Sequence, residues 1–139
     1  MHSQASCIFC QIVAGQSPCF QVHEDAETLV FMDLFPVARG HTLVIPKPHA
    51  ENIFETDAEM LASVARSVKR VAEAIRSVIA PEGLGVFQLN GAAAGQTVFH
   101  HHTHLIPRWG GDALVLHSRV RGDDAELADV AAQLARALR

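Results

Sequence analysis

The sequence has no excess of basic residues, no internal repeat and no long apolar run. Lys and Arg number 11 against 15 Asp and Glu, and a net charge of -4 argues against a broad basic surface for nucleic acid. No segment approaches the roughly 20 apolar residues that span a bilayer. The beginning, MHSQASCIFCQIVAGQ, lacks the basic start and long apolar core of a signal peptide. We therefore expect a cytoplasmic protein with no membrane partner.

Cysteine is scarce, and all three residues, Cys7, Cys10 and Cys19, lie near the beginning of the chain. An odd, crowded set indicates reduced thiols or metal ligands rather than a disulfide framework. The spacing Cys7-x-x-Cys10 is that of half a tetrahedral zinc site. Two buried reduced cysteines are the alternative. A thiol redox pair is disfavoured, because no βαβ unit surrounds the motif.

The length of 139 residues and the hydrophobic content of 49% predict a single domain. Hydrophobic periodicity then gives its elements. We expect strands near 20–23, 28–32, 41–47 and 84–90, a long amphipathic helix that begins with a Thr56/Glu59 capping box and ends by Pro81 and Gly83, and a second helix from 123 or 124 to 139. Short connections favour antiparallel neighbours, so this order predicts an α+β fold.

The stretch QTVFHHHTHLIPR, residues 96–108, contains four histidines in five consecutive positions. The β-favouring residues that flank the histidines predict a strand. Alternation along a strand places His100, His102 and His104 on one face, with neighbours about 7 Å apart. Three imidazoles on one face indicate a metal site or imidazole-based chemistry.

A neutral imidazole is a competent nucleophile and general base near neutral pH. Attack on a phosphoryl centre forms a phospho-histidine that water hydrolyses. Such a transfer needs donors for the phosphate oxygens. The preceding loop offers the side chains of Asn90, Gln96 and Thr97, and Gly91 and Gly95 allow a close backbone approach.

The segment GQTVFHHHTHLIPR resembles the signature of the histidine triad (HIT) family, His-φ-His-φ-His-φ-φ. The similarity extends through CIFCQIVAG, FMDLFPVARGHTLVIPKPH and LNGAAAGQ, over roughly residues 7 to 110. The resemblance implies a HIT-like fold, with an antiparallel sheet of about five strands, one long central helix and a C-terminal helix. It implies one HIT domain over 1–139, with a core at 7–110 and a tail at 111–139. It also implies a homodimer whose two sheets join into one.

The resemblance further implies an enzyme that acts on purine nucleotides. His102, in the middle of the triad, would attack the α-phosphorus and form a nucleotidyl-histidine, which water then hydrolyses. His104 would assist this site and its leaving group, and His100 would complete the catalytic set. The favoured reaction is cleavage of the P–N bond of nucleoside 5′-phosphoramidates, with no organic cofactor. One alternative is a dinucleoside polyphosphate hydrolase; another, of a different class, is a non-catalytic nucleotide- or metal-binding module.

The family pattern also assigns binding residues. Asp33 matches the residue that bonds the ribose hydroxyls, and a carboxylate suits a 2′,3′-diol. The positions that match the base pocket and the phosphate contacts are Ile8, Phe9 and Phe31 for the base, and Asn90, Gln96, Thr97 and Val98 for the phosphate or ribose. In a zinc-containing subset of the family, the ligands match Cys7, Cys10, His49 and His100, so we expect structural zinc there.

The sequence departs from the family pattern at three places. His101 and Thr103 replace large apolar residues within the triad, so the back of this strand is unusually polar. Leu89 stands where many relatives have a polar residue before Gly91, which puts one phosphate or ribose contact in doubt. The segment past Gly111 is longer than the minimal domain, and such segments in this family can shape substrate choice.

Overall fold

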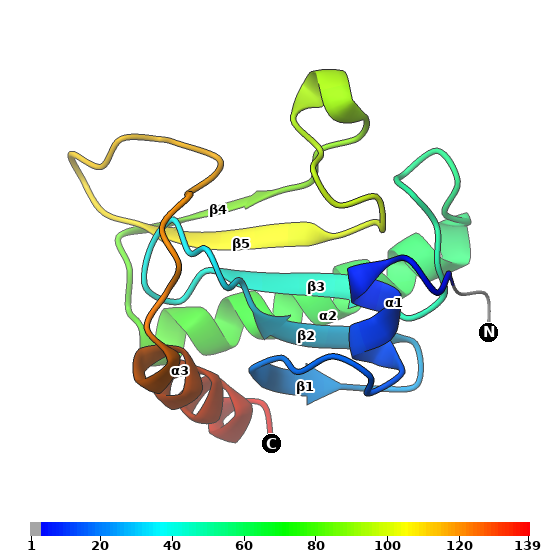
Figure 1. Ribbon diagram of the computed structural model, residues 1–139. Helices are drawn as coiled ribbons and strands as arrows, with labels where there is room; N and C mark the ends of the chain where they lie inside the picture. The colour runs from blue at the N-terminus through cyan, green and yellow to red at the C-terminus, as the bar shows by residue number, and fades with distance from the viewer. Residues whose placement is uncertain (1–3) are drawn as a thin grey trace.

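The structure, a computed structural model, describes residues 4–139; residues 1–3, which the sequence analysis includes in the domain, lie outside the described residues. The chain forms one five-stranded sheet of order β1-β2-β3-β5-β4, in which all neighbours are antiparallel (Figure 1). The elements are α1 (Ile8–Val13), β1 (Gln21–Glu24), β2 (Thr28–Met32), β3 (Thr42–Pro46), α2 (Ala58–Val78), β4 (Gly83–Phe87), β5 (Thr103–Arg108) and α3 (Asp124–Ala137). The predicted α+β class is confirmed. Within residues 4–139, no helix is both long and apolar enough to cross a bilayer.

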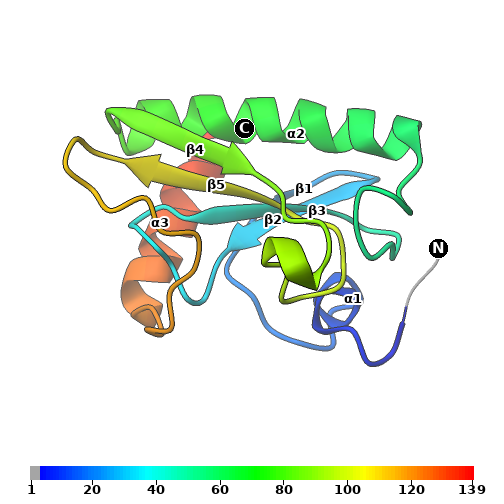
Figure 2. The same ribbon diagram turned by 90° about the horizontal axis from the view of Figure 1, so that it is seen from above.

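The sheet separates two apolar clusters, because alternate residues of its strands face opposite sides. Helices α2 and α3 cover one face, and α1 lies across the other (Figure 2). On the α2 side, Val30 and Val44 pack with residues of both helices. On the α1 side, Phe31 and Leu43 pack with Phe9. The functional residues lie on this second face.

The long predicted helix exists and ends before Pro81, but its first turn differs from the prediction. Asp57, not Thr56, caps α2, and its carboxylate accepts from the Met60 N–H at 2.8 Å. Thr56 instead donates its hydroxyl to the Asn52 carbonyl oxygen, so the capping-box prediction is wrong. The helix ends at Val78, and Gly83 already belongs to β4.

Two features near the chemistry were not predicted. The cysteine segment forms the short helix α1, in which the Cys7 side chain accepts from the Cys10 N–H and caps the first turn. Strand β5 begins only at Thr103, so the predicted strand through the whole histidine run is wrong. The reason is that the His101 N–H donates to the Ala50 carbonyl at 2.7 Å, outside the sheet.

Candidate active site

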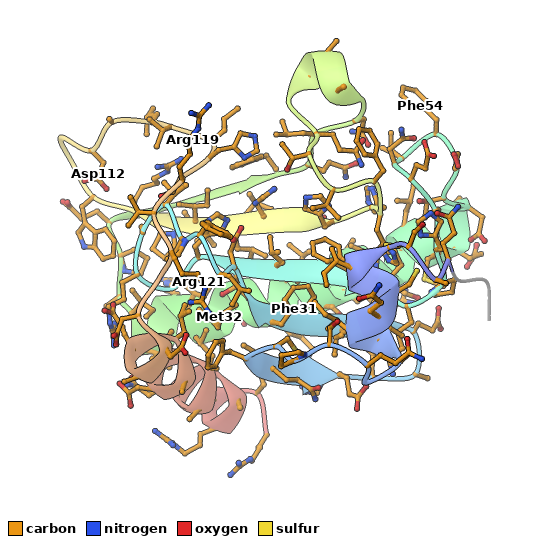
Figure 3. The ribbon with its side chains drawn as sticks, in the orientation of Figure 1. Phe31, Met32, Phe54, Asp112, Arg119 and Arg121 are labelled. Carbon is orange, nitrogen blue, oxygen red and sulfur yellow. The ribbon has the colours of Figure 1, made fainter. Side chains whose placement is uncertain are left out.

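A cavity of about 280 Å³ opens on the α1 face of the sheet. Phe31, labelled on the sheet beside α1 in Figure 3, forms part of its apolar end with Ile8, Phe9 and Leu43. The Phe9 ring meets the Phe31 ring edge to face, with centroids 5.4 Å apart. This end suits a flat, apolar group such as a nucleobase.

The other end of the cavity is polar. Asp33, His41, His102 and His104 line it, together with Thr97. The rings of His102 and His104 lie 4.9 Å apart, whereas the Nδ1 atom of His100 points to the cysteines. The three predicted histidines therefore divide between two neighbouring sites. His102 and His104 face the cavity, and His100 lies behind them.

His102 is held in one tautomer by the backbone. Its Nδ1 lies 2.7 Å from the carbonyl oxygen of His100, and a carbonyl only accepts, so Nδ1 carries the hydrogen. The lone pair of the neutral ring is therefore on Nε2. Burial lowers the pKa of His102 and so favours the neutral form, whereas the bond to His100 acts in the opposite direction. His102 thus has the protonation pattern of a nucleophile.

His41 and His104 form a second pair with fixed hydrogens. The Val37 N–H donates to His41 Nδ1 at 3.0 Å, so His41 carries its hydrogen on Nε2. That Nε2 donates to His104 Nδ1 at 2.9 Å, so His104 carries its hydrogen on Nε2. The Nε2–H of His104 is buried without a hydrogen-bond partner among residues 4–139. It is a donor left for a bound molecule.

Burial also keeps this pair neutral. It is the largest cause that lowers the pKa of His41 and of His104 to about 3 each. Asp33 Oδ2 lies 3.4 Å from His41 Nε2, but with a neutral imidazole this contact is not an ion pair. The other carboxylate oxygen of Asp33 accepts from the Phe35 N–H at 2.8 Å. Burial raises the pKa of Asp33, and the Phe35 bond opposes the rise.

The donors and acceptors of the Gly91–Gly95 loop serve mainly to shape it. Gln96 accepts from the Gly91 N–H and donates to the carbonyl oxygens of Glu51 and Val98. The carboxamide oxygen of Asn90 accepts from the Ile53 N–H. Neither side chain lines the cavity, whereas Thr97 and Val98 do. Gly91 and Gly95 have φ of 95° and 105°, values that favour glycine and allow the tight turn.

A second cluster lies beside the cavity, where the ligand atoms of Cys7, Cys10, His49 and His100 are all within 4.8 Å of one another. His100 Nε2 donates to the Pro46 carbonyl at 2.7 Å, which leaves a lone pair on Nδ1, 3.5 Å from Cys10 Sγ. Burial raises the pKa of the Cys10 thiol. Two thiols and two imidazoles are a common donor set for tetrahedral zinc, so the residues fit this ion.

Two further imidazoles, which the sequence alone did not indicate, belong to this neighbourhood. His41 lies within the quoted stretch FMDLFPVARGHTLVIPKPH, but it is separated by 63 positions from its partner His104. His117 lies on the long segment after β5 and lines the cavity. A register between β3 and β5 that pairs Leu43 with His104 brings His41 to the site, and no local pattern predicts it.

Comparison with known proteins agrees with this architecture. A model of the HIT domain matches residues 14–111. The chain is 44% identical over 131 residues to Protein hit of Bacillus subtilis, which covers 94% of this chain and 90% of that protein. It is 36% identical over 136 residues to Adenylylsulfatase HINT3 of Arabidopsis thaliana, and the match covers 98% of this chain and 69% of that protein.

Solved structures give the same result. A Hit-like protein involved in cell-cycle regulation from Bartonella henselae superposes with a TM-score of 0.91 and 34% identity over 99% of both chains. A Zn-bound histidine triad family protein from Mycobacterium smegmatis superposes with a TM-score of 0.84 and 39% identity, covering 96% of this chain and 93% of that one. The predicted HIT-like fold is therefore confirmed, and this chain belongs to the histidine triad (HIT) family.

Proposed function

We propose that this protein is a nucleotide hydrolase that cleaves the P–N bond of purine nucleoside 5′-phosphoramidates through a nucleotidyl-His102 intermediate. One observation carries the proposal. The bond from His102 Nδ1 to the His100 carbonyl leaves the Nε2 lone pair of a buried, cavity-lining imidazole as the nucleophilic atom. A buried neutral imidazole with its lone pair on Nε2 is suited to nucleophilic catalysis.

In the proposed reaction, His102 Nε2 forms a bond to the α-phosphorus and the bond to the leaving group breaks. The Nε2–H of His104, whose ring lies 4.9 Å from that of His102, is a donor for a phosphoryl oxygen. Water then attacks the phosphorus, and the P–N bond to His102 breaks. The bond to the His100 carbonyl holds His102 in one orientation during both steps.

The nucleoside is proposed to occupy the apolar end. Ile8, Phe9 and Phe31 would contact the base, and Asp33 would accept from the ribose hydroxyls. Thr97 and the Val98 backbone would contact phosphate. Asn90 and Gln96 would act indirectly, since their amides hold the loop that presents these groups.

Other leaving groups are alternatives to the amine in the proposed reaction. The similarity to Adenylylsulfatase HINT3 makes a sulfate leaving group a candidate, and a dinucleoside polyphosphate would share the same first step. The experiment is to follow AMP release from adenosine 5′-phosphoramidate, adenylyl sulfate and diadenosine polyphosphates. We expect the highest kcat/KM with the phosphoramidate. Binding of AMP with no turnover of any substrate would instead support a non-catalytic binding module.

We also propose that Cys7, Cys10, His49 and His100 hold a structural zinc ion. The donor set and the likeness to a Zn-bound relative support this. Bound zinc would join α1, the His49 segment and the histidine run, which stabilises the fold beside His102. Reduced thiolates at the site also suit the cytoplasm, where we expect the protein to act.

The proposed homodimer would form at the edge of the sheet. Strand β4 ends the strand order, and Val86 on it is 47% exposed. An edge strand presents unpaired backbone groups, which a second copy can pair. The neighbouring groove includes His101 and Thr103, the polar residues at the back of the triad. A Val86→Glu variant should run as a monomer in light scattering; a monomeric wild type would contradict the dimer.

A further inference from the structure

A long segment after β5, residues 109–122, passes over the polar end of the cavity; we call it the strap. In Figure 3 its course runs from the outer bend at Asp112 through Arg119 to Arg121, across the ends of the strands. The Arg108 guanidinium donates to the Val115 carbonyl oxygen at 2.6 Å. At the far end, the Gly122 N–H donates to the Leu34 carbonyl at 2.8 Å. These anchors hold the strap against the site.

The strap brings one imidazole to the cavity. His117 lines it beside Leu116 and Ser118, and its ring lies 6.3 Å from that of His104. His117 Nε2 donates to the Gly95 carbonyl oxygen at 2.9 Å, which joins the strap to the glycine loop. Because a carbonyl only accepts, Nε2 keeps its hydrogen in every protonation state, and Nδ1 is the atom that gains or loses a proton.

A phosphoramidate poses a problem that the buried histidines do not solve. An amine leaves phosphorus as a neutral molecule only if its nitrogen receives a proton. Burial, as the largest cause, holds the pKa of His41 and of His104 at about 3, so near neutral pH neither ring carries a second proton. His117, in contrast, is exposed to solvent.

His117 also interacts electrostatically with the residues at the polar end of the cavity. A positive charge on its ring is one of the causes, after burial, that lower the pKa of His102, His104 and His41. The same charge opposes the rise that burial produces in the pKa of Asp33. Asp33 and the three buried histidines at the polar end therefore all interact with this one imidazole.

On the basis of the proposed function, we propose that His117 is a further catalytic residue, the general acid that protonates the leaving nitrogen. His102 Nε2 forms the new bond to phosphorus, and the P–N bond of the substrate breaks with its electron pair on the leaving nitrogen. That nitrogen takes the Nδ1 proton of the His117 imidazolium, and the neutral Nε2–H ring remains on Gly95. In the second step, water attacks phosphorus, the electron pair returns to His102 Nε2, and His117 Nδ1 accepts the proton of water.

The test compares two leaving groups in one variant. His117→Gln places an amide N–H where Nε2–H donates to Gly95, but it has no transferable proton. The probes are adenosine 5′-phosphoramidate and the p-nitrophenyl ester of AMP, whose phenolate departs without a proton. We expect kcat for the phosphoramidate to fall by roughly 10²- to 10⁴-fold, whereas release of p-nitrophenolate in the first turnover stays near the wild-type rate.

The outcomes are separable. Equal slowing with both probes would overturn the assignment, because His117 would then act on the nucleotide or on the loop, and so would an unchanged rate with both. Leu114→Ala, at a strap residue that is 78% exposed and outside the cavity, is the matched control and should match the wild type. Failure of the wild type itself to turn over either probe would overturn the proposed function as a whole.

Discussion

The imidazoles of His41 and His104 share one hydrogen bond, 2.9 Å long, between residues 63 positions apart in the chain. The Val37 N–H on the other side of His41 fixes its direction, from His41 to His104. The relationship links a backbone amide in the segment between β2 and β3 to the donor that His104 presents in the cavity. Such a bond fixes the tautomer and the orientation of the His104 ring.

His41→Asn tests this orientation. The asparagine retains an acceptor near the Val37 N–H but lacks the Nε2–H that His104 needs. His104 then loses its fixed tautomer, and we expect kcat for AMP release to fall roughly 10²-fold with little change in KM. Steady-state kinetics on the folded variant checks this. A rise in KM alone would mean that His41 serves only nucleotide binding.

The depressed pKa of His41 predicts acid sensitivity. Burial holds it at about 3 in the folded protein, against an ordinary value of 6.5. The unfolded chain therefore binds this proton more readily, so the contribution to stability is full above about pH 6.5 and is lost as the pH falls towards 3. At about pH 5 the free energy of unfolding is lower by roughly 2 kcal/mol because of His41.

Urea unfolding of the wild type and of His41→Asn at about pH 7 and pH 5 isolates the contribution of His41 to the free energy of unfolding. The variant lacks the titrating imidazole. Its free energy of unfolding should therefore fall less on acidification than that of the wild type, by about 2 kcal/mol. The same loss in both proteins would show that His41 is protonated in the native state near pH 5.

Asp33→Asn separates binding from chemistry. The variant keeps the oxygen that accepts from the Phe35 N–H but removes the charge proposed to bond the ribose hydroxyls. A charge-assisted hydrogen bond is worth about 1.5–3 kcal/mol, so the Kd of AMP should rise at least tenfold, and kcat should change less. Calorimetric titration measures this. An unchanged affinity would remove Asp33 from the nucleotide site.

Zinc content tests the second cluster. Replacing Cys7 and Cys10 together by serine removes both thiolates, so the metal content and the Tm should both fall. Cys19→Ser is the matched control, because Cys19 lies outside the four-residue cluster and should change neither. Elemental analysis that finds no zinc in the wild type would contradict the site.

Local sequence patterns predict much of this fold, but they do not predict the contacts between distant segments that form the site. The short run of β-favouring apolar residues in β2 and the helical spacing in α2 identify those elements directly, because β2 is buried on both faces and α2 along one stripe. The start of β5 could not be read, since His101 bonds to the Ala50 backbone through a contact between distant segments. A strand pattern contains no information about such a contact.

The site shows the same division. Family resemblance places His102, His104 and the Cys7/Cys10 pair, and the structure brings them to one face of the sheet. The role of His41 depends on the register between β3 and β5, and the position of His117 depends on a strap without regular structure. Nothing in the local sequence distinguishes His117 from an ordinary surface histidine.

The most direct test of the mechanism is the intact mass of the protein, quenched during turnover of adenosine 5′-phosphoramidate. We predict an added mass of one AMP in the wild type, mapped to His102. His102→Ala should keep its fold and its zinc, show no added mass, and lose several orders of magnitude of turnover, as expected when a covalent nucleophile is removed. Turnover retained by His102→Ala, or an adduct on another residue, would contradict nucleophilic attack by His102.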